Sequence, residues 1–287
     1  MTPTPPSLST RRAWVTLATE PEYLPGALGL ARSLRRSRSE YPLIVMVTHP
    51  QYPSMVDALR SEGCEVREVE PILHGDSSFA AARYAAVWAK LRVWEFEDLD
   101  RAVFLDDDML VLRNMDELFD MELPPEGIAA SPACRCNPHH RSTYPKDWIP
   151  ENCYYTHVKQ ASQPAVAGGQ DYFNAGLLVL QPDRRDFAAF LRRLALPDAP
   201  PLPFADQDLL NEHFRARWKI LPYTFNALKT LRYCHPSLWN IADVRNLHFI
   251  LDKPWDAGSA DDSLYGDLNA LWREIYDEGT PNNLHKR

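Results

Sequence analysis

The chain contains little glycine, with 11 residues among 287. Residues 15–23, which follow the start of the first predicted strand, contain none of them, so the glycine-rich phosphate loop of a nucleotidyltransferase is missing. No apolar run approaches the ~18–20 residues that a membrane-spanning helix needs. Residues 1–12 contain prolines and serines but no hydrophobic signal segment. We therefore expect no membrane span and a disordered tail over residues 1–12.

Cysteine and positive charge are also scarce. Five cysteines, an odd number at irregular spacing, do not form the pattern of a disulfide framework. Cys134 and Cys136, followed by His139 and His140, are zinc-binding residue types, but their spacing fits no common zinc site. We therefore favour a reduced, cytoplasmic protein. The net charge of -8 argues against nucleic acid as a partner, since nucleic-acid binders usually carry a basic surface.

Hydrophobic residues make up 45% of the chain, enough for the core of one large domain. Strand-like runs alternate with helical patterns in the first half, which predicts a Rossmann-like, doubly wound, mostly parallel α/β sheet. We find no internal repeat and no clear domain boundary. The predicted strands cover residues 13–18, 43–48, 64–69, 102–105, 176–180 and 246–251, and the predicted helices cover residues 23–36, 55–62, 80–96, 204–214 and 268–276.

Residues 134–164 form an irregular stretch rich in His, Pro, Tyr and Cys. A loop of this length is usually functional or disordered. Its aromatic residues favour a segment that covers a substrate.

The sharpest local signal is the triplet Asp106, Asp107 and Asp108, directly after the apolar residues 102–105. Ligands of open α/β sheets bind beyond the carboxyl ends of strands. Adjacent carboxylates repel one another unless a cation neutralises them. Asp106 and Asp108 would point to the same side of an extended backbone, where they suit Mg²⁺ or Mn²⁺. The triplet alone predicts a metal–phosphate site, which a phosphatase could also have.

The triplet resembles the Asp-x-Asp motif of glycosyltransferase family 8, the family of glycogenin and plant galactinol synthase. The resemblance extends from Trp14 to Trp255. It implies one catalytic domain of the GT-A type over residues 13–256, with residues 134–164 on the acceptor side, and a C-terminal extension with a helix over residues 257–287. It also implies a UDP-hexose donor, Mn²⁺ or Mg²⁺ as the cofactor, and a small polyol or carbohydrate as the acceptor.

The same resemblance assigns residues to the donor. Residues 15–19 and Tyr23 resemble the opening that grips uracil, where a tyrosine stacks on the base. Residues 88–94 resemble the helix whose lysine reaches the donor, and residues 172–177 resemble the segment that binds the sugar. The residues implied to bind the donor are Leu17, Thr19, Tyr23, Arg83, Lys90, Asp106, Asp107, Asp108, Asn174, Ala175, Gly176, Asp206, Gln207, His248 and Lys253.

His248 and Lys253 resemble the closing motif of the family, in which a histidine completes the metal site and a lysine binds the diphosphate. The implied metal ligands are thus Asp106, Asp108 and His248. The sequence departs from the family between His248 and Lys253, where a glycine is usual and residues 249–252 contain none. Asp252 also adds a negative charge near the expected phosphates.

The family retains the configuration of the anomeric carbon. Asp206, Gln207 and Lys90 are the implied catalytic residues, with Asp206 and Gln207 beside the reacting carbon. Retention needs either a covalent intermediate, for which Asp206 is the candidate nucleophile, or attack on the same face within an ion pair. We favour the second route.

Two subfamilies fit the chain. Residues 63–71, 90–96 and 172–176 look most like galactinol synthase, which moves galactose from UDP-galactose to myo-inositol. The alternative is glycogenin, which uses UDP-glucose and glucosylates its own tyrosine, with Tyr233 near the matching position. A third reading is a UDP-sugar-binding protein without turnover, although the metal carboxylates are intact. Members of both subfamilies can self-associate, which leaves a homo-oligomer open.

Overall fold

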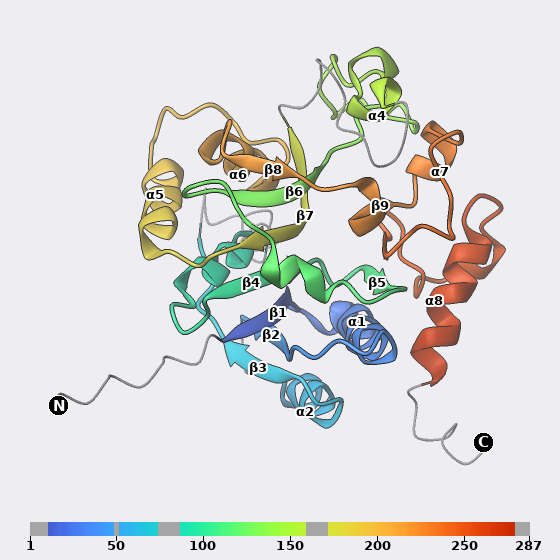
Figure 1. The fold of residues 1–287 in the computed structure, drawn as a ribbon, viewed down its shortest axis with the longest axis horizontal. Coiled ribbons are helices and arrows are strands. Elements are labelled where there is room, and N and C mark those ends of the chain that lie inside the picture. Colours follow the sequence, from blue (N-terminus) through green and yellow to red (C-terminus); the bar gives the residue numbers. More distant parts are fainter. Residues whose placement is uncertain (1–10, 49–51, 74–86, 159–171, 279–287) are drawn as a thin grey trace.

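The computed structural model describes residues 11–48, 52–73, 87–158 and 172–278. Its centre is a seven-stranded sheet with the order β3-β2-β1-β4-β7-β6-β8 (Figure 1). The strands are β1 (Arg12–Leu17), β2 (Leu43–Val47), β3 (Glu65–Glu68), β4 (Arg101–Leu105), β6 (Ile128–Pro132), β7 (Phe173–Leu180) and β8 (Trp218–Ile220).

All neighbouring strands of this sheet are parallel except at β7, which is antiparallel to both β4 and β6. The start of β7 therefore lies beside the end of β4, with Leu177 opposite Leu105. The prediction of a Rossmann-like, mostly parallel α/β fold is confirmed. Because β7 runs antiparallel to β4, residues 174–176 at the start of β7 lie beside the end of β4, next to Asp106.

A second, smaller sheet has the order β5-β10-β9. Its strands are β5 (Met109–Val111), β9 (Ala227–Leu228) and β10 (Asn246–His248). β10 pairs antiparallel with β5, and His248 lies opposite Met109. The turn at residues 106–108 thus connects the central sheet to the small one.

Helices cover both faces of the central sheet. The α-helices are α1 (Leu24–Arg36), α2 (Pro53–Ser61), α4 (Tyr154–His157), α5 (Arg184–Leu194), α6 (Asp206–His213), α7 (Leu231–Cys234) and α8 (Gly266–Glu278). Short 3-10 helices occupy Pro21–Tyr23, Ala89–Glu95, Asp116–Asp120, Pro150–Asn152, Tyr223–Phe225 and Ser259–Asp261. Among the described residues, no helix combines the length and apolarity that a bilayer crossing requires.

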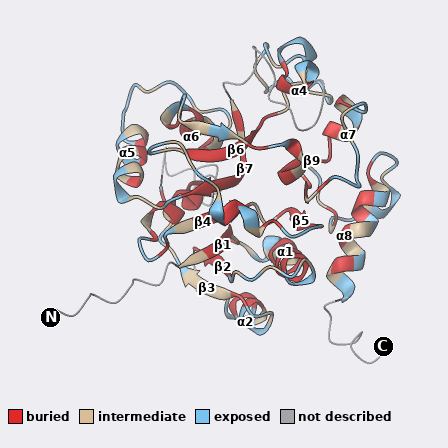
Figure 2. Ribbon diagram, viewed as in Figure 1, coloured by how far each residue is buried: buried red, intermediate tan, exposed pale blue. Residues whose placement is uncertain are grey.

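The core follows from alternation along the strands. Trp14 of β1 packs into the cluster beside α1 and α2, while its neighbour Val15 packs into the cluster on the opposite face. β4 repeats the pattern with Val103 and Phe104. Successive side chains of a strand point to opposite faces, so apolar runs produce a sheet that is buried on both sides (Figure 2).

α8 packs against α1, so the last described helix lies beside the first (Figure 1). Trp272 of α8 sits over Gly29, where an added Cβ would come within 2.9 Å of the indole nitrogen. The guanidinium of Arg32 lies 4.6 Å from the ring centre of Tyr276 and donates to the Tyr276 carbonyl. Trp255 also packs on Trp272, with 5.2 Å between the ring centres.

Several elements differ from the sequence prediction. Arg12, assigned to the tail, begins β1. Of the predicted 80–96 helix, the described residues Val87 and Trp88 are α-helical, but Ala89–Glu95 forms a 3-10 helix. β5, β6, β8 and α5 lie outside the predicted elements. β6 is Ile-Ala-Ala-Ser-Pro, which lacks β-branched alternation, and it forms because it pairs with both β7 and β8.

Candidate active site

The acidic triplet lies in the turn between β4 and β5. The amide of Asp106 donates to the Gly176 carbonyl of β7 (2.8 Å), and the Phe249 amide donates to the Asp108 carbonyl (2.9 Å). Each sheet therefore holds one end of the turn. Asp108 is buried, and Asp106 keeps about a third of its side-chain surface.

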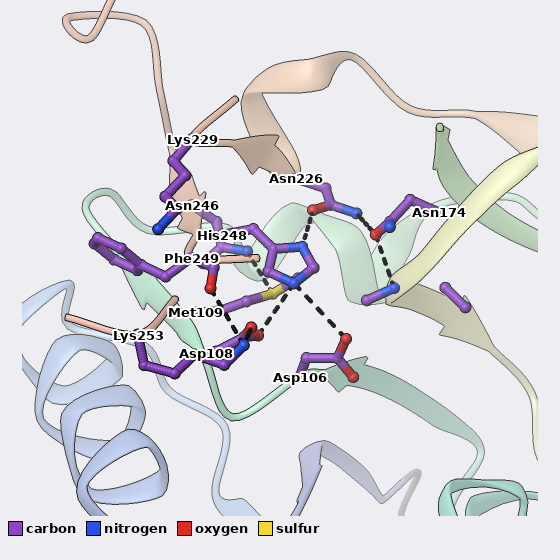
Figure 3. A network of polar contacts seen from close by, with 12 residues as sticks. Asp106, Asp108, Met109, Asn174, Asn226, Lys229, Asn246, His248, Phe249 and Lys253 are labelled. Atoms are coloured by element: carbon purple, nitrogen blue, oxygen red, sulfur yellow. Dashed lines mark hydrogen bonds and ion pairs between the residues drawn. The ribbon is translucent and has the colours of Figure 1, made fainter. Parts of the chain in front are cut away.

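Three ligand atoms converge in this turn. The Nε2 atom of His248 lies 3.1 Å from Asp108 Oδ1 and 3.8 Å from Asp106 Oδ2 (Figure 3). Ligand atoms of the three residues all lie within 4.8 Å of one another. The structure thus brings together Asp106, Asp108 and His248, the three residues that the sequence predicts as metal ligands.

A chain of hydrogen bonds fixes the tautomer of His248. The Gly176 amide donates to Asn174 Oδ1 (3.0 Å), so the atom of Asn226 that faces Asn174 Oδ1 at 2.8 Å must be its NH₂ group. The carbonyl oxygen of Asn226 then faces Nδ1 of His248 at 2.8 Å (Figure 3). Nδ1 must therefore carry a proton, so in the neutral form of the ring it is Nε2 that presents a lone pair to the two carboxylates.

This arrangement fits a divalent cation. Asp108 Oδ1 is buried and has no hydrogen-bond donor, and the neutral imidazole facing it offers another electron pair. Acceptors that face one another across about 3 Å repel unless a cation lies between them. Two carboxylates and an imidazole are a suitable ligand set for Mn²⁺.

Gly176 makes room for His248. A Cβ atom at position 176 would come within 2.4 Å of the imidazole Cε1. The glycine is therefore required by the histidine packed on it.

Two lysines flank the ligand atoms. Lys90 Nζ lies 2.8 Å from Asp106 Oδ1 and 2.9 Å from Asp206 Oδ2, and it donates to the Ala175 carbonyl at 3.2 Å. Burial would lower the pKa of Lys90, but the two carboxylates outweigh burial and hold its pKa above the ordinary value. Lys90 is therefore a buried cation that joins the acidic turn to the start of α6.

Lys253 forms an ion pair with Asp108 Oδ2 and donates to the Phe249 carbonyl at 3.3 Å. Burial would raise the pKa of Asp108, but the positive charge of Lys253 outweighs burial, so this pKa lies below the ordinary value. Within the described part of the chain, no lysine or arginine pairs with Asp107 in this way, and burial together with Asp108 raises its pKa well above the ordinary value. Lys253 thus favours the ionised form of Asp108, in contrast to Asp107.

A cavity of about 320 Å³ opens beside these groups. It contains most of the residues that the sequence predicts for the donor, although they come from five separate segments. Its lining consists of Leu17, Thr19, Tyr23, Val87, Lys90, Phe104, Asp106, Asp107, Asp108, Asp206 and Lys253. Arg83, also predicted for this site, lies outside the described residues.

A second cavity of about 140 Å³ is lined by Gln207, the residue after Asp206. Residues of the 134–164 segment form much of its wall, together with Asn174 and Phe204. Its lining consists of Ala133, Cys134, Asn137, Pro138, His139, Arg141, Tyr144, Trp148, Asn174, Phe204, Gln207, Leu228, Thr230, Ile250 and Leu251.

Backbone amides also orient the amide side chains between the cavities. The Ala175 amide donates to Gln207 Oε1 (3.1 Å), and Asn174 Nδ2 donates to the same oxygen (3.1 Å). The NH₂ group of Gln207 therefore faces the Tyr172 hydroxyl (3.2 Å), which in turn donates to Asp208 (2.5 Å). Asn174 and Gln207 are thus held in one orientation before any ligand binds.

The loop between His248 and Lys253 shows how the missing glycine is tolerated. Leu251 has a φ of +68°, in the left-handed region that glycine adopts without cost. Asp252 is exposed and does not line the donor cavity, and its carbonyl accepts a hydrogen bond from Lys229 (2.6 Å). The extra negative charge noted in the sequence is therefore exposed to solvent and is not part of the donor-cavity wall.

Asn226 is a site residue that the sequence analysis misses, since a lone Asn within residues 225–228 carries no motif. We expect Asn226→Ala to lower Mn²⁺ affinity about 10–100-fold, because Nδ1 of His248 loses the acceptor that fixes its proton. Isothermal titration with Mn²⁺ measures the effect, and Asn240→Ala, at an exposed turn, is the control. Unchanged affinity in Asn226→Ala would contradict the assigned tautomer.

The fold and the site together define a glycosyltransferase of the GT-A type. Residues 14–258 match the family described as "Glycosyl transferase family 8". The chain is 32% identical to galactinol synthase 1 of Arabidopsis thaliana over 93% of this chain and 79% of that protein. It is 33% identical to galactinol synthase 1 of Solanum lycopersicum over 93% of this chain and 82% of that protein.

Solved structures show the same fold. The galactosyltransferase LgtC, in complex with donor and acceptor sugar analogs, superposes with a TM-score of 0.64 at 18% identity, covering 93% of this chain and 95% of that chain. Mouse xyloside xylosyltransferase 1 gives a TM-score of 0.55 at 14% identity, covering 86% and 100%. The chain belongs to glycosyltransferase family 8. The predictions of this family, of its galactinol synthase relatives and of a UDP-sugar-dependent glycosyltransferase are confirmed.

Proposed function

We propose that the chain transfers galactose from UDP-galactose to myo-inositol, with retention of configuration and with Mn²⁺ or Mg²⁺ as the cofactor. The observation that carries the proposal is a pair of cavities whose walls contain consecutive residues, Asp206 in the larger and Gln207 in the smaller. The galactinol synthases that are similar to this chain support the choice of donor and acceptor. A reduced, cytoplasmic setting, expected from the cysteine usage, is part of this proposal.

The larger cavity is the donor site in this proposal. Leu17, Thr19 and Tyr23 bind the uracil at one end, with the exposed face of Tyr23 available for stacking. Asp106, Asp108 and His248 hold the metal, which supplies positive charge to the diphosphate leaving group. Lys253 contributes a further positive charge on the same side.

The sugar lies between the two cavities. Asn174 and Gln207 present amide groups whose orientation the backbone of β7 already fixes, so little ordering is needed when the donor binds. Asp206 is buried and its carboxylate forms an ion pair with Lys90, which disfavours a role for this carboxylate as the nucleophile. We therefore retain attack of the acceptor oxygen on the face that UDP leaves. The bond from the anomeric carbon to the diphosphate breaks first to give an ion pair, the acceptor oxygen then bonds to that carbon on the same face, and the acceptor's proton passes to a phosphate oxygen of the departing UDP.

The smaller cavity is the acceptor site in this proposal, and residues between Cys134 and Trp148 form its cover. Trp148 and Phe204 stack with 4.6 Å between their ring centres, and Tyr144 packs edge-on against both. Aromatic faces with a few polar groups suit a polyol ring, which has apolar C–H edges and many hydroxyls. His139, Arg141 and Thr230 supply polar atoms at this wall.

The test measures UDP release from a panel of UDP-sugars with Mn²⁺, with and without myo-inositol, followed by mass spectrometry of the small molecules and the protein. We expect release that depends on UDP-galactose and myo-inositol, together with a galactosyl-inositol product. Gln207→Ala should lose product. The control is Asn240→Ala on the surface, which should keep it. Release without an inositol-linked product would contradict the proposed acceptor.

The same experiment addresses the glycogenin alternative. Tyr233 lies on α7 with 62% of its surface exposed, and it lines neither of the two cavities. A hexose added to the protein with UDP-glucose, and lost in Tyr233→Phe, would replace the galactinol synthase proposal with self-glucosylation.

A further inference from the structure

Four potential metal ligands gather outside the donor site. Cys134 and Cys136 follow β6, Cys153 precedes α4, and His235 follows α7. Figure 1 places α4 and α7 on the same side of the molecule. The sequence analysis considers zinc ligands within residues 134–140 only. The fold instead supplies the partners from Cys153 and His235, about 20 and 100 residues further along.

The spacing of the four ligand atoms matches a tetrahedral zinc site. The Nε2 atom of His235 lies 3.2, 3.4 and 3.7 Å from the sulfurs of Cys136, Cys153 and Cys134. The sulfurs of Cys134 and Cys153 are 3.9 Å apart. A tetrahedron with normal zinc bond lengths has edges of about 3.5 Å between sulfur and nitrogen and about 3.8 Å between sulfurs. The observed distances lie close to these edges.

A disulfide does not explain the cluster. All five cysteines are free, and 3.9 Å is far beyond the ~2.05 Å of an S–S bond. Three thiols and an imidazole also have little reason to meet in an apolar core. Cys153 is fully buried and His235 is 8% exposed, beside Tyr155 and Leu231.

The surroundings support thiolate ligands. The backbone amide of Arg135 donates to Cys153 Sγ (3.4 Å), a contact that stabilises negative charge on a coordinating sulfur. Cys234, next to His235, is the fifth cysteine near this cluster and lies outside the set of four. Four protein ligands leave no open position, which is the arrangement of structural zinc sites.

We propose that Cys134, Cys136, Cys153 and His235 bind one structural Zn²⁺, which ties the start and the later part of the 134–158 segment to each other and to the end of α7. Cys134 and Thr230 both line the smaller cavity, so the zinc fixes two walls of that cavity relative to each other. The zinc site does not depend on the proposed function. Its effect on acceptor binding does rest on the smaller cavity being the acceptor site.

The first experiment measures zinc in the full chain purified without chelator, by inductively coupled plasma mass spectrometry and native mass spectrometry. We expect one Zn²⁺ per chain, and loss of it in Cys136→Ser and Cys153→Ser. Cys64→Ser, at a buried cysteine of another core cluster, is the matched control and should keep the zinc. Asp108→Ala should also keep it, which separates this site from the donor site. Retention in Cys136→Ser and Cys153→Ser would overturn the proposal.

Cobalt provides a readout that does not depend on a variant folding. Co²⁺ exchanged into the wild-type chain should give an intense thiolate-to-cobalt absorption band, since three sulfurs coordinate it. Cys234→Ser should keep this band. If the band is lost in Cys234→Ser but retained in His235→Ala, the assignment of His235 as a ligand is overturned. A wild-type chain without zinc, without a cobalt band, or with a disulfide detected by mass would overturn the whole proposal.

Zinc removal tests the structural role. Hydrogen exchange of residues 134–158 should rise after chelation, while exchange in β1 and β4 stays unchanged. The KM for the acceptor should rise about ten-fold or more, as for other lost metal-supported contacts, with the KM for the donor unaltered once Mn²⁺ is restored. Faster exchange without a change in the acceptor KM would support the structural role of the zinc. It would contradict the assignment of the smaller cavity as the acceptor site. Unchanged exchange after complete zinc removal would reject the structural role.

Discussion

Asp108→Ala is expected to lower kcat/KM for sugar transfer at least about 1,000-fold, since a catalytic metal contributes several kcal/mol of charge stabilisation. The substitution removes a buried ligand atom 3.1 Å from His248 Nε2, and it also removes the carboxylate that pairs with Lys253. No neighbouring carboxylate can replace it, because Asp106 is already a proposed ligand and Asp107 resists ionisation through its raised pKa. Initial rates at a series of Mn²⁺ concentrations measure the loss.

The loss must be separated from misfolding. Asp261→Ala, at an exposed aspartate, should retain full activity, and the melting temperature of Asp108→Ala should be followed alongside. Calorimetry with Mn²⁺ should show that Asp108→Ala loses the strong metal site while the chain stays folded. Wild-type transfer by folded Asp108→Ala in the presence of Mn²⁺ would refute the metal assignment.

Lys90→Met is expected to destabilise the protein by about 3 kcal/mol, because breaking a buried ion pair leaves an uncompensated charge. Lys90 lies between Asp106 and Asp206, and both carboxylates would lose their shared cation. Transfer should fall about 100-fold or more, because removing one positioned charge at the reacting groups costs about 3 kcal/mol. Urea unfolding and initial rates measure the two effects.

A double substitution separates stability from catalysis. Adding Asp206→Asn to Lys90→Met removes one of the two unpaired carboxylates, so part of the stability should return while transfer stays low. The non-additivity of the pair measures the interaction directly. Lys219→Met, at an exposed lysine of β8, is the control and should change neither quantity. Recovery of transfer in the double variant would show that Lys90 acts only by offsetting Asp206.

Short-range patterns predicted much of the fold and the donor site. Apolar runs such as Leu43–Val47 become buried strands because each lies between two layers of helices, and the acidic triplet follows one of those strands. The roles assigned to Tyr23, Asn174, Gln207 and the other site residues stay predictions, although the structure places most of them at one of the two cavities. The domain boundary at residue 256, donor binding by Arg83 and self-association of the chain also stay predictions.

What the sequence could not provide are contacts between distant segments that lack a motif. Asn226 matters only because β9 pairs with β10 and brings it against His248. Lys90 meets Asp206 across 116 positions, and a lone charged residue on either segment looks solvated. Cys153 and His235 are likewise unremarkable in sequence until α4 and α7 approach each other.

The packing of α8 on α1 has a consequence for synthesis of the chain. Gly29 and Arg32 are synthesised about 240 residues before their partners Trp272 and Tyr276. Until then the outer face of α1 stays open to water, and Trp255, two residues after Lys253, lacks its support. If translation stalls before residue 266, the nascent chain therefore exposes an apolar surface that chaperones and proteases recognise. This surface distinguishes chains that lack α8 from chains that contain it.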